Sequence, residues 1–145
     1  MNSLLLGIPV LLSSLIIQAT ATVAIVRVVA ALIRRGFAGR SFWLDVAIMM
    51  IVLTIALASI LAQVAVWAAG LLACGEFGDF PTALYHSAVN FTTLGYGDIV
   101  MSHTWRLLGP LEAANGVLMC GISASGLFAV TNRLIKMRLT RDGQS

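Results

Sequence analysis

Three long runs of apolar residues alternate with short polar stretches along the chain. They extend from about Leu4 to Leu32, from about Ala47 to Ala73 and from about Leu107 to Val130. Each run exceeds the roughly 20 apolar residues that a helix needs to cross a hydrocarbon core of about 30 Å. The pattern therefore predicts an all-α integral membrane protein with three transmembrane helices.

Composition agrees with a membrane protein and leaves little room for other classes. Hydrophobic residues make up 59% of the 145 residues and charged residues only 10%, whereas an ordinary soluble domain has about 25% charged residues. The length is filled by the three helices and their connections, without a second domain. No nucleophile, metal cluster or carboxylate pair is recognisable in a position that a substrate could reach, so an enzyme is not predicted.

Basic residues gather at two places, near the first connection and at the end of the chain, and only Arg106 lies elsewhere. The positive-inside rule makes both places cytoplasmic and puts the amino terminus outside, in a multi-pass protein of the plasma (inner) membrane. The pI of about 9.4 then reflects topology and possible contact with anionic lipids, and gives no support for nucleic-acid binding. The residues are Arg27, Arg34, Arg35, Arg40, Arg133, Lys136, Arg138 and Arg141.

The first apolar run leaves two interpretations open. Ala19-Thr20-Ala21 could serve as a cleavage site after a secretory signal, but such a signal begins with basic residues, and Met1-Asn2-Ser3 has none. We therefore favour a retained helix over residues 4–33. Its expected place is the periphery, against the outer helix of its own or a neighbouring subunit.

The most specific signal is the loop 92–98, which reads Thr-Thr-Leu-Gly-Tyr-Gly-Asp. A loop that replaces the water around a cation must present carbonyl oxygens to one side at successive levels, which requires alternating right- and left-handed backbone conformations. Glycine adopts the left-handed region at little cost, and Gly95 and Gly97 lie two residues apart. Thr93 can add its hydroxyl oxygen, while Tyr96 would point away from the ion path and pack into the surrounding protein.

This string resembles the Thr-x-Gly-Tyr-Gly filter signature of the potassium channel superfamily, with Leu94 where valine or isoleucine is usual. The resemblance extends more loosely over residues 80–133, and Tyr85-His86-Ser87 is similar to bacterial channels of the one-pore-loop type. The resemblance implies potassium-selective conduction. It also implies a homotetramer, because one pore loop per chain cannot close a ring. Potassium ions would be bound by filter carbonyls alone, without a cofactor, at Thr93, Leu94, Gly95, Tyr96 and Gly97. A weakly selective cation channel and a non-conducting accessory membrane protein stay open as alternatives.

The resemblance also implies a pore domain over residues 42–134. It would consist of an outer helix at 42–73, a re-entrant pore helix and filter at 80–98 and an inner helix at 104–134, followed by a short cytoplasmic tail at 135–145. Pro81 suits the first turn of the pore helix, where a missing backbone donor costs least. The carboxyl end of that helix would direct its negative dipole end toward the ion path and stabilise a cation there.

Glu112 is the only acid in the third apolar run, so it is costly unless it faces protein or water. Family members support their filters with buried hydrogen bonds behind the threonines, and the position that often carries an acid in the pore helix is Val89 here. We expect Glu112 to accept a hydrogen bond from Asn90, Thr92 or a backbone amide. The alternative is that it reaches the outer headgroups. Together with Asp98, these residues form the predicted filter support.

Glycines in the third apolar run are candidates for gating. Gly116, Gly121 and Gly126 recur at five-residue intervals, so they do not share one helical stripe. Some can permit close helix packing and one can act as a hinge. Counted from the filter, Gly116 lies near the family's usual hinge position and Gly121 beyond it. Ser125 and Ala129 are the predicted cavity and gate surface.

Five further residues have weaker functional interpretations. Glu76 and Asp79 either raise the cation concentration at the pore mouth or are solvated turn charges. His86 is interpreted as a packing or interfacial residue, with proton sensing as the alternative. Cys74 and Cys120 are expected at different membrane depths and are interpreted as structural, although a bridge from Cys74 to a neighbouring subunit stays open.

Overall fold

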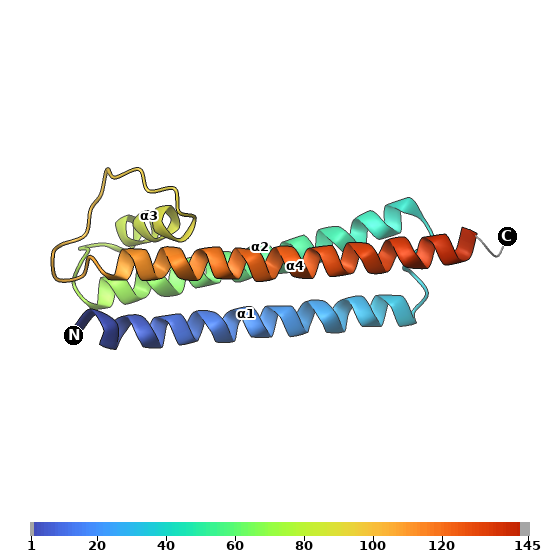
Figure 1. Ribbon diagram of the computed structural model, residues 1–145, viewed down its shortest axis with the longest axis horizontal. Helices are drawn as coiled ribbons and strands as arrows, with labels where there is room; N and C mark the ends of the chain where they lie inside the picture. Colours follow the sequence, from blue (N-terminus) through green and yellow to red (C-terminus); the bar gives the residue numbers. More distant parts are fainter. Residues whose placement is uncertain (1, 143–145) are drawn as a thin grey trace. The chain divides into compact units, whose positions relative to one another are not determined.

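The computed structural model describes residues 2–142, and this range contains four helices and no strand. In chain order they are α1 (Asn2–Arg34), α2 (Phe42–Ala73), α3 (Phe80–Phe91) and α4 (Leu108–Asp142) (Figure 1). Three helices are long and apolar enough to cross a membrane, over Leu4–Arg34, Phe42–Ala73 and Leu108–Thr140. The protein is therefore all-helical in its described part, with the three candidate spans that the apolar runs predicted.

Helix α4 differs from the predicted inner helix at both ends. It begins at Leu108 instead of residue 104, because the backbone first turns at Ser102, whose carbonyl accepts hydrogen bonds from the amides of Trp105 and Arg106. It also continues through residues 135–142, which were predicted to be a tail. Leucine, methionine, lysine and arginine dominate that stretch, and all four favour helix. Residues 143–145 of the predicted tail lie outside the described range.

The chain divides into two compact units, and each long helix contributes to both. The first unit contains Met1–Gln18 and Ser59–Cys120, and the second contains Ala19–Ala58 and Gly121–Ser145. The first unit therefore holds α3, the loop 92–107 and the adjoining parts of α1, α2 and α4. All candidate filter residues belong to it.

Within the first unit, α1 packs closely on both α2 and α4. A Cβ atom added to Gly70 of α2 would lie 3.0 Å from Val10 Cγ2, and one added to Gly7 would lie 3.0 Å from Leu108 Cδ2 of α4. Small residues at such crossings let helix backbones approach in a membrane. The amino-terminal helix thus packs against two other helices of its own chain.

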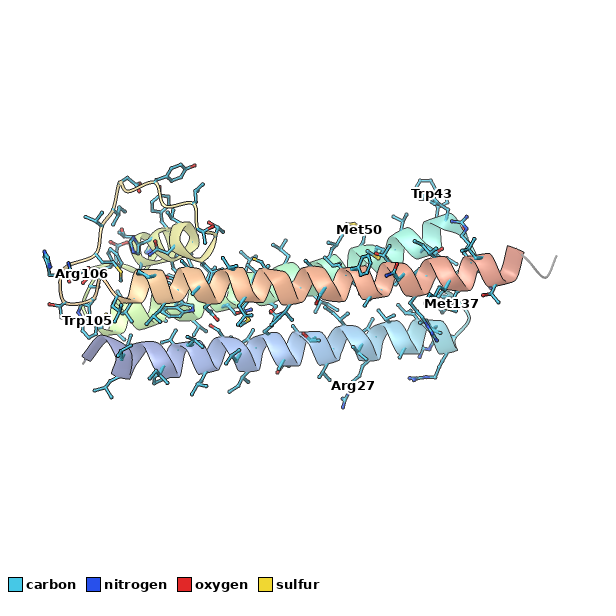
Figure 2. The ribbon with its side chains drawn as sticks, in the orientation of Figure 1. Arg27, Trp43, Met50, Trp105, Arg106 and Met137 are labelled. Carbon is cyan, nitrogen blue, oxygen red and sulfur yellow. The ribbon has the colours of Figure 1, made fainter. Side chains whose placement is uncertain are left out.

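The second unit has its own apolar core and includes the connection between α1 and α2. In that connection the Gly39 amide donates to Asp45 Oδ1 at 2.8 Å, and a Cβ on Gly39 would lie 3.4 Å from the Arg138 backbone nitrogen. Arg27 points away from the packed helices (Figure 2), as a residue that snorkels to an interface does. The buried core residues are Val29, Ala38, Ile48, Val52, Val130 and Leu134.

Candidate ion-conduction site

Helix α3 begins with a capping arrangement that its sequence encodes. Asp79 is the N-cap residue, and its carboxylate accepts hydrogen bonds from the Thr82 amide at 2.9 Å and the Thr82 hydroxyl at 2.8 Å. These two bonds hold the pKa of Asp79 below its usual range, and the bond from the Thr82 amide has the larger effect. Pro81 occupies the first turn, where no intrahelical donor is needed. Asp79 therefore caps α3, a role that differs from both a pore-mouth charge and a solvated turn charge.

The backbone after α3 alternates in handedness. Thr93 has φ 59°, Gly95 has φ 58° and Gly97 has φ 74°, so every second residue lies in the left-handed region. Both glycines thus have the conformation that a carbonyl-lined loop requires. Thr93 is the one non-glycine residue with positive φ in the described chain, and this conformation costs an L-residue about 1–2 kcal/mol.

Hydrogen bonds from the loop to the end of α3 orient its peptide groups. The Thr93 amide donates to Asn90 O at 2.9 Å, the Leu94 amide to Val89 O at 2.9 Å and the Gly95 amide to Val89 O at 3.4 Å. In a trans peptide the carbonyl points opposite to the amide. The carbonyls that precede these three amides, which belong to residues 92–94, therefore point away from α3.

Apolar side chains of the loop have no cover within their own chain. Leu94 is 54% exposed, Tyr96 67% and Val100 78%, and no atom lies within 4 Å of a Cβ built on Gly95 or Gly97. Tyr96 was expected to pack into surrounding protein, and its own chain does not supply that packing. These apolar side chains are therefore exposed in the single chain.

Two side chains of α3 hold the segment that follows the loop. The Tyr85 hydroxyl donates to Asp98 Oδ2 at 2.7 Å, and the His86 ring makes a hydrogen bond with the Ile99 backbone. The bond from Tyr85 lowers the pKa of Asp98, and the same bond raises the pKa of Tyr85. In Figure 1 the chain leaves the end of α3, arches beside it and returns to the start of α4. Both ends of the candidate filter are thus fastened to α3.

Glu76, in the connection before α3, also bonds to the returning segment. Its two carboxylate oxygens accept hydrogen bonds from the amide and the hydroxyl of Ser102. The Ser102 hydroxyl is therefore engaged, and it does not cap α4 as its position near Leu108 could suggest. Figure 2 places Trp105 and Arg106 on the same returning segment, just before α4. This acid closes the loop instead of acting as a free turn charge.

Glu112 lies fully buried, with 0% of its surface exposed. Its Oε1 is hydrogen-bonded to the hydroxyl of Ser87 on α3, and the Asn90 side chain also interacts with the carboxyl group. Asn90 was an expected partner, whereas Ser87 was not. Thr92 is engaged elsewhere, since its hydroxyl donates to Ala88 O at 2.7 Å. The interpretation that Glu112 reaches the headgroups does not fit a side chain in this position.

Ser87 has one hydroxyl proton and two acceptors, because it also contacts the Val64 carbonyl at 2.9 Å. A carbonyl can only accept. When the Ser87 proton goes to Val64, the proton between Ser87 and Glu112 has to come from the carboxyl group. The geometry thus favours a neutral, protonated Glu112 that joins α4 to α3.

This arrangement predicts different results for two substitutions of Glu112. Glu112→Gln should melt close to the wild type, because the amide can donate to Ser87 in place of the carboxylic acid. Glu112→Ala should lower the free energy of unfolding by about 1–3 kcal/mol, the usual cost of removing a buried partner. Thermal unfolding of the purified protein measures both. Equal melting of the alanine variant and the wild type would contradict the link between α3 and α4.

His86 predicts a pH dependence of stability. The ring is 5% exposed and accepts from Asn90 Nδ2 at 2.8 Å, and burial lowers the pKa of His86 below 6.5, although nearby Glu76 and Asp98 oppose the shift. Between the lowered pKa and 6.5 the unfolded chain binds more protons than the folded chain, so stability falls as the pH drops through this window. Asp98 titrates lower, since its own pKa is lowered.

Melting temperatures between pH 8 and pH 5 should therefore decrease in the wild type, with the loss beginning near the ordinary histidine pKa of about 6.5. His86→Gln keeps an acceptor for Asn90 and cannot be protonated, so its melting temperature should be flatter over the same range. An identical pH profile in both proteins would show that His86 does not bury a neutral ring.

The three glycines of α4 have different surroundings. A Cβ on Gly116 would lie 1.8 Å from the carbonyl oxygen of Phe91, whereas nothing lies within 4 Å of one on Gly121 or Gly126. Gly116 is thus the point where the end of α3 rests on α4. Gly121 is free of such contacts within its own chain, which leaves it the better hinge candidate. Ser125 donates to Ile122 O within its helix at 2.8 Å and is exposed.

Cysteines and metal ligands add no further site to the described chain. Cys74 and Cys120 are both free thiols, and Cys74 donates to Leu71 O at 3.1 Å. Among residues 2–142 no group of three or more histidine, cysteine or acidic side chains is placed to hold a metal ion.

Sequence reasoning missed Ser87 and Tyr85, which connect α3 to Glu112 and Asp98. A signal for Ser87 existed, because Ala83, His86 and Ser87 are spaced as one buried face of a helix. Nothing local indicated Tyr85, since its partner lies 13 residues further along the chain.

The chain is similar to a known protein family over the helices and the loop that build this site. The family described as "Ion channel" matches residues 49–133, which is more than half of the chain. The chain therefore belongs to this ion channel family and is a member of the potassium channel superfamily. No curated protein and no solved structure matches the chain significantly.

Proposed function

We propose that the protein is the subunit of a homotetrameric, potassium-selective channel, in which residues 93–97 bind K⁺ through their backbone carbonyls. The observation that carries this proposal is the positive φ of every second loop residue, at Thr93, Gly95 and Gly97. The hydrogen bonds from loop amides to α3 support it, because they turn the preceding carbonyls toward a common side. Membership of the ion channel family supports passive transport as the activity.

Four copies are proposed because one loop encloses nothing. The exposed side chains of Leu94 and Tyr96 need cover from neighbouring chains. A recess of about 480 Å³ lies between α3, the loop and the start of α4, lined in part by His86, Asn90 and Arg106. Such a recess suits a side chain from an adjacent copy. In this arrangement α2 is the outer helix, α3 the pore helix and α4 the inner helix, with the amino terminus outside.

Ion flux from liposomes that contain the purified protein tests the function. A potassium gradient should drive flux, and a sodium gradient of equal size should drive much less. Equal flux with both ions would instead make the protein a weakly selective cation channel, as Leu94 in the filter allows. Absence of flux with either ion would favour a non-conducting accessory protein.

Ion-dependent stability is a further prediction. An ion that binds only the folded filter stabilises it by mass action, so the tetramer in mild detergent should melt at a higher temperature in potassium or rubidium than in sodium. Size-exclusion chromatography with light scattering gives the number of subunits in the same sample. A monomer or dimer whose melting is indifferent to the ion would contradict the proposal.

A further inference from the structure

Five side chains buried in the first unit carry polar atoms that have no hydrogen-bond partner in the described chain. The atoms are Ser14 Oγ, Gln63 Oε1, Trp67 Nε1, Glu112 Oε2 and both polar atoms of the Asn115 amide. None of these residues is more than 3% exposed. An unpaired polar group in an apolar interior costs several kcal/mol, so a cluster of them needs a physical explanation.

On α1, Ser14 faces the space between α2 and α4. It lies two helical turns after Gly7, which contacts Leu108 of α4, and about one turn after Val10, which contacts Gly70 of α2. Residues one or two turns apart share a face of a helix. The position of Ser14 between these two contacts agrees with its complete burial.

On α2, Gln63 and Trp67 face the same space. The Gln63 amide nitrogen donates to Gln18 Oε1 of α1 at 3.1 Å and to Ser59 Oγ at 3.2 Å, while the Val64 carbonyl faces α3. Gln63 thus marks the side of α2 that meets α1, and Val64 marks the side that meets α3. Trp67 is one turn after Gln63 and nearly one turn after Val64, so its ring lies between these two sides.

On α4, Asn115 lies between two contacts as well. It is one turn after Leu111, which lies 3.3 Å from a Cβ built on Gly7 of α1. It is also nearly one turn after Glu112, which is bonded to Ser87 of α3, and Ser87 in turn contacts the Val64 carbonyl of α2. Its amide therefore faces the junction where α1, α2 and α4 meet.

The four side chains also lie within about one helical turn of one another along the helices. Helices α1 and α4 run in the same direction (Figure 1), and Gly7 of α1 meets Leu108 of α4. Ser14 lies seven residues, or about 10 Å, after Gly7, and Asn115 lies seven residues after Leu108. Ser14 and Asn115 are therefore level with each other.

Helix α2 runs in the opposite direction, and its Gly70 meets Val10. Seven residues back from Gly70, Gln63 is level with its partner Gln18, about one turn beyond Ser14. Trp67, one turn closer to Gly70, is nearly level with Ser14.

We propose that Ser14, Gln63, Trp67 and Asn115 form a binding site for buried water at the junction of α1, α2 and α4. The unpartnered atoms match a water molecule, since Trp67 Nε1 and Asn115 Nδ2 donate, Gln63 Oε1 and Asn115 Oδ1 accept, and the serine hydroxyl does both. Buried waters typically make two to four such bonds. The site fastens the amino-terminal helix to the two pore-domain helices and lies outside the ion path.

Hydroxyl-radical footprinting of the purified protein in nanodiscs tests the site, because radicals formed from a bound water label the side chain beside it. Trp67 is 1% exposed, yet its indole should be labelled well above Phe91, a ring of equal burial, after correction for intrinsic reactivity. Ser14→Ala and Asn115→Leu should each reduce the labelling of Trp67 several-fold. Trp105 in the loop before α4 is half-buried and serves as the reference for a tryptophan with partial access to solvent.

Ser13→Ala is the matched control. The Ser13 hydroxyl donates to Pro9 O of its own helix at 2.9 Å, so its loss should leave the labelling of Trp67 unchanged. If Asn115→Leu does not fold, Ser14→Ala alone decides the test. An unlabelled Trp67, as expected when the polar side chains pair directly with one another, would overturn the proposal. So would labelling that both junction variants leave unchanged.

Discussion

Gly95→Ala is expected to abolish selective potassium conduction while the protein still folds in the membrane. Gly95 has φ 58°, a region in which a Cβ atom adds about 1–2 kcal/mol of strain. Four proposed subunits would carry this strain around one ring. The backbone can relieve it by rotating toward negative φ, and that rotation turns a carbonyl out of the row that binds ions. The expected loss is therefore in selectivity, and liposome flux with potassium and sodium gradients measures it.

Gly78→Ala is the matched control for this substitution. Gly78 lies in the connection before α3, its φ is not in the left-handed region, and nothing lies within 4 Å of a Cβ built there. The control should therefore conduct like the wild type. If Gly95→Ala kept the same preference for potassium over sodium as the control, residues 93–97 would not be the filter.

Those parts of the fold that a local sequence pattern determines could be predicted. Apolar runs gave the three spanning helices because only a helix satisfies its own backbone over that length in a membrane. Pro81 marked the start of α3, since an early proline suits a helix amino terminus, whereas the capping role of Asp79 became clear only from the structure. Gly95 and Gly97 indicated an alternating loop for a similar reason, because positive φ is local to each residue.

Other features depended on contacts that no local pattern contains. Thr93 has positive φ although threonine disfavours it, and this follows from the hydrogen bonds that pull the loop amides back onto α3. Glu112 could be recognised as a buried acid, but its bond to Ser87 joins residues 25 positions apart. The extension of α4 beyond residue 134 was missed because basic residues there were interpreted as a tail.

The glycines of α4 illustrate the same limit most directly, since nothing in the sequence shows which of Gly116, Gly121 and Gly126 lies against another helix. Gly116→Ala should severely impair folding or assembly, because its Cβ would lie 1.8 Å from the Phe91 carbonyl oxygen and 2.7 Å from the carbonyl carbon. Both are backbone atoms, so no side-chain rotation relieves the clash, and overpacking of this kind costs about 1–3 kcal/mol or more.

The displacement would also reach the filter loop. Phe91 is the last residue of α3, and the loop amides are bonded to the carbonyls of Val89 and Asn90 just before it. Gly116→Ala should therefore lower the yield of tetramer and its melting temperature, and remove the stabilisation by potassium in any tetramer that forms.

Gly121→Ala is the control on the same helix. It has open space at the Cβ position and should melt at or above the wild-type temperature, since alanine favours helix by about 1 kcal/mol over glycine. Wild-type melting and flux in Gly116→Ala would mean that α3 does not rest on α4 at this residue, and the support proposed for the filter would fail with it.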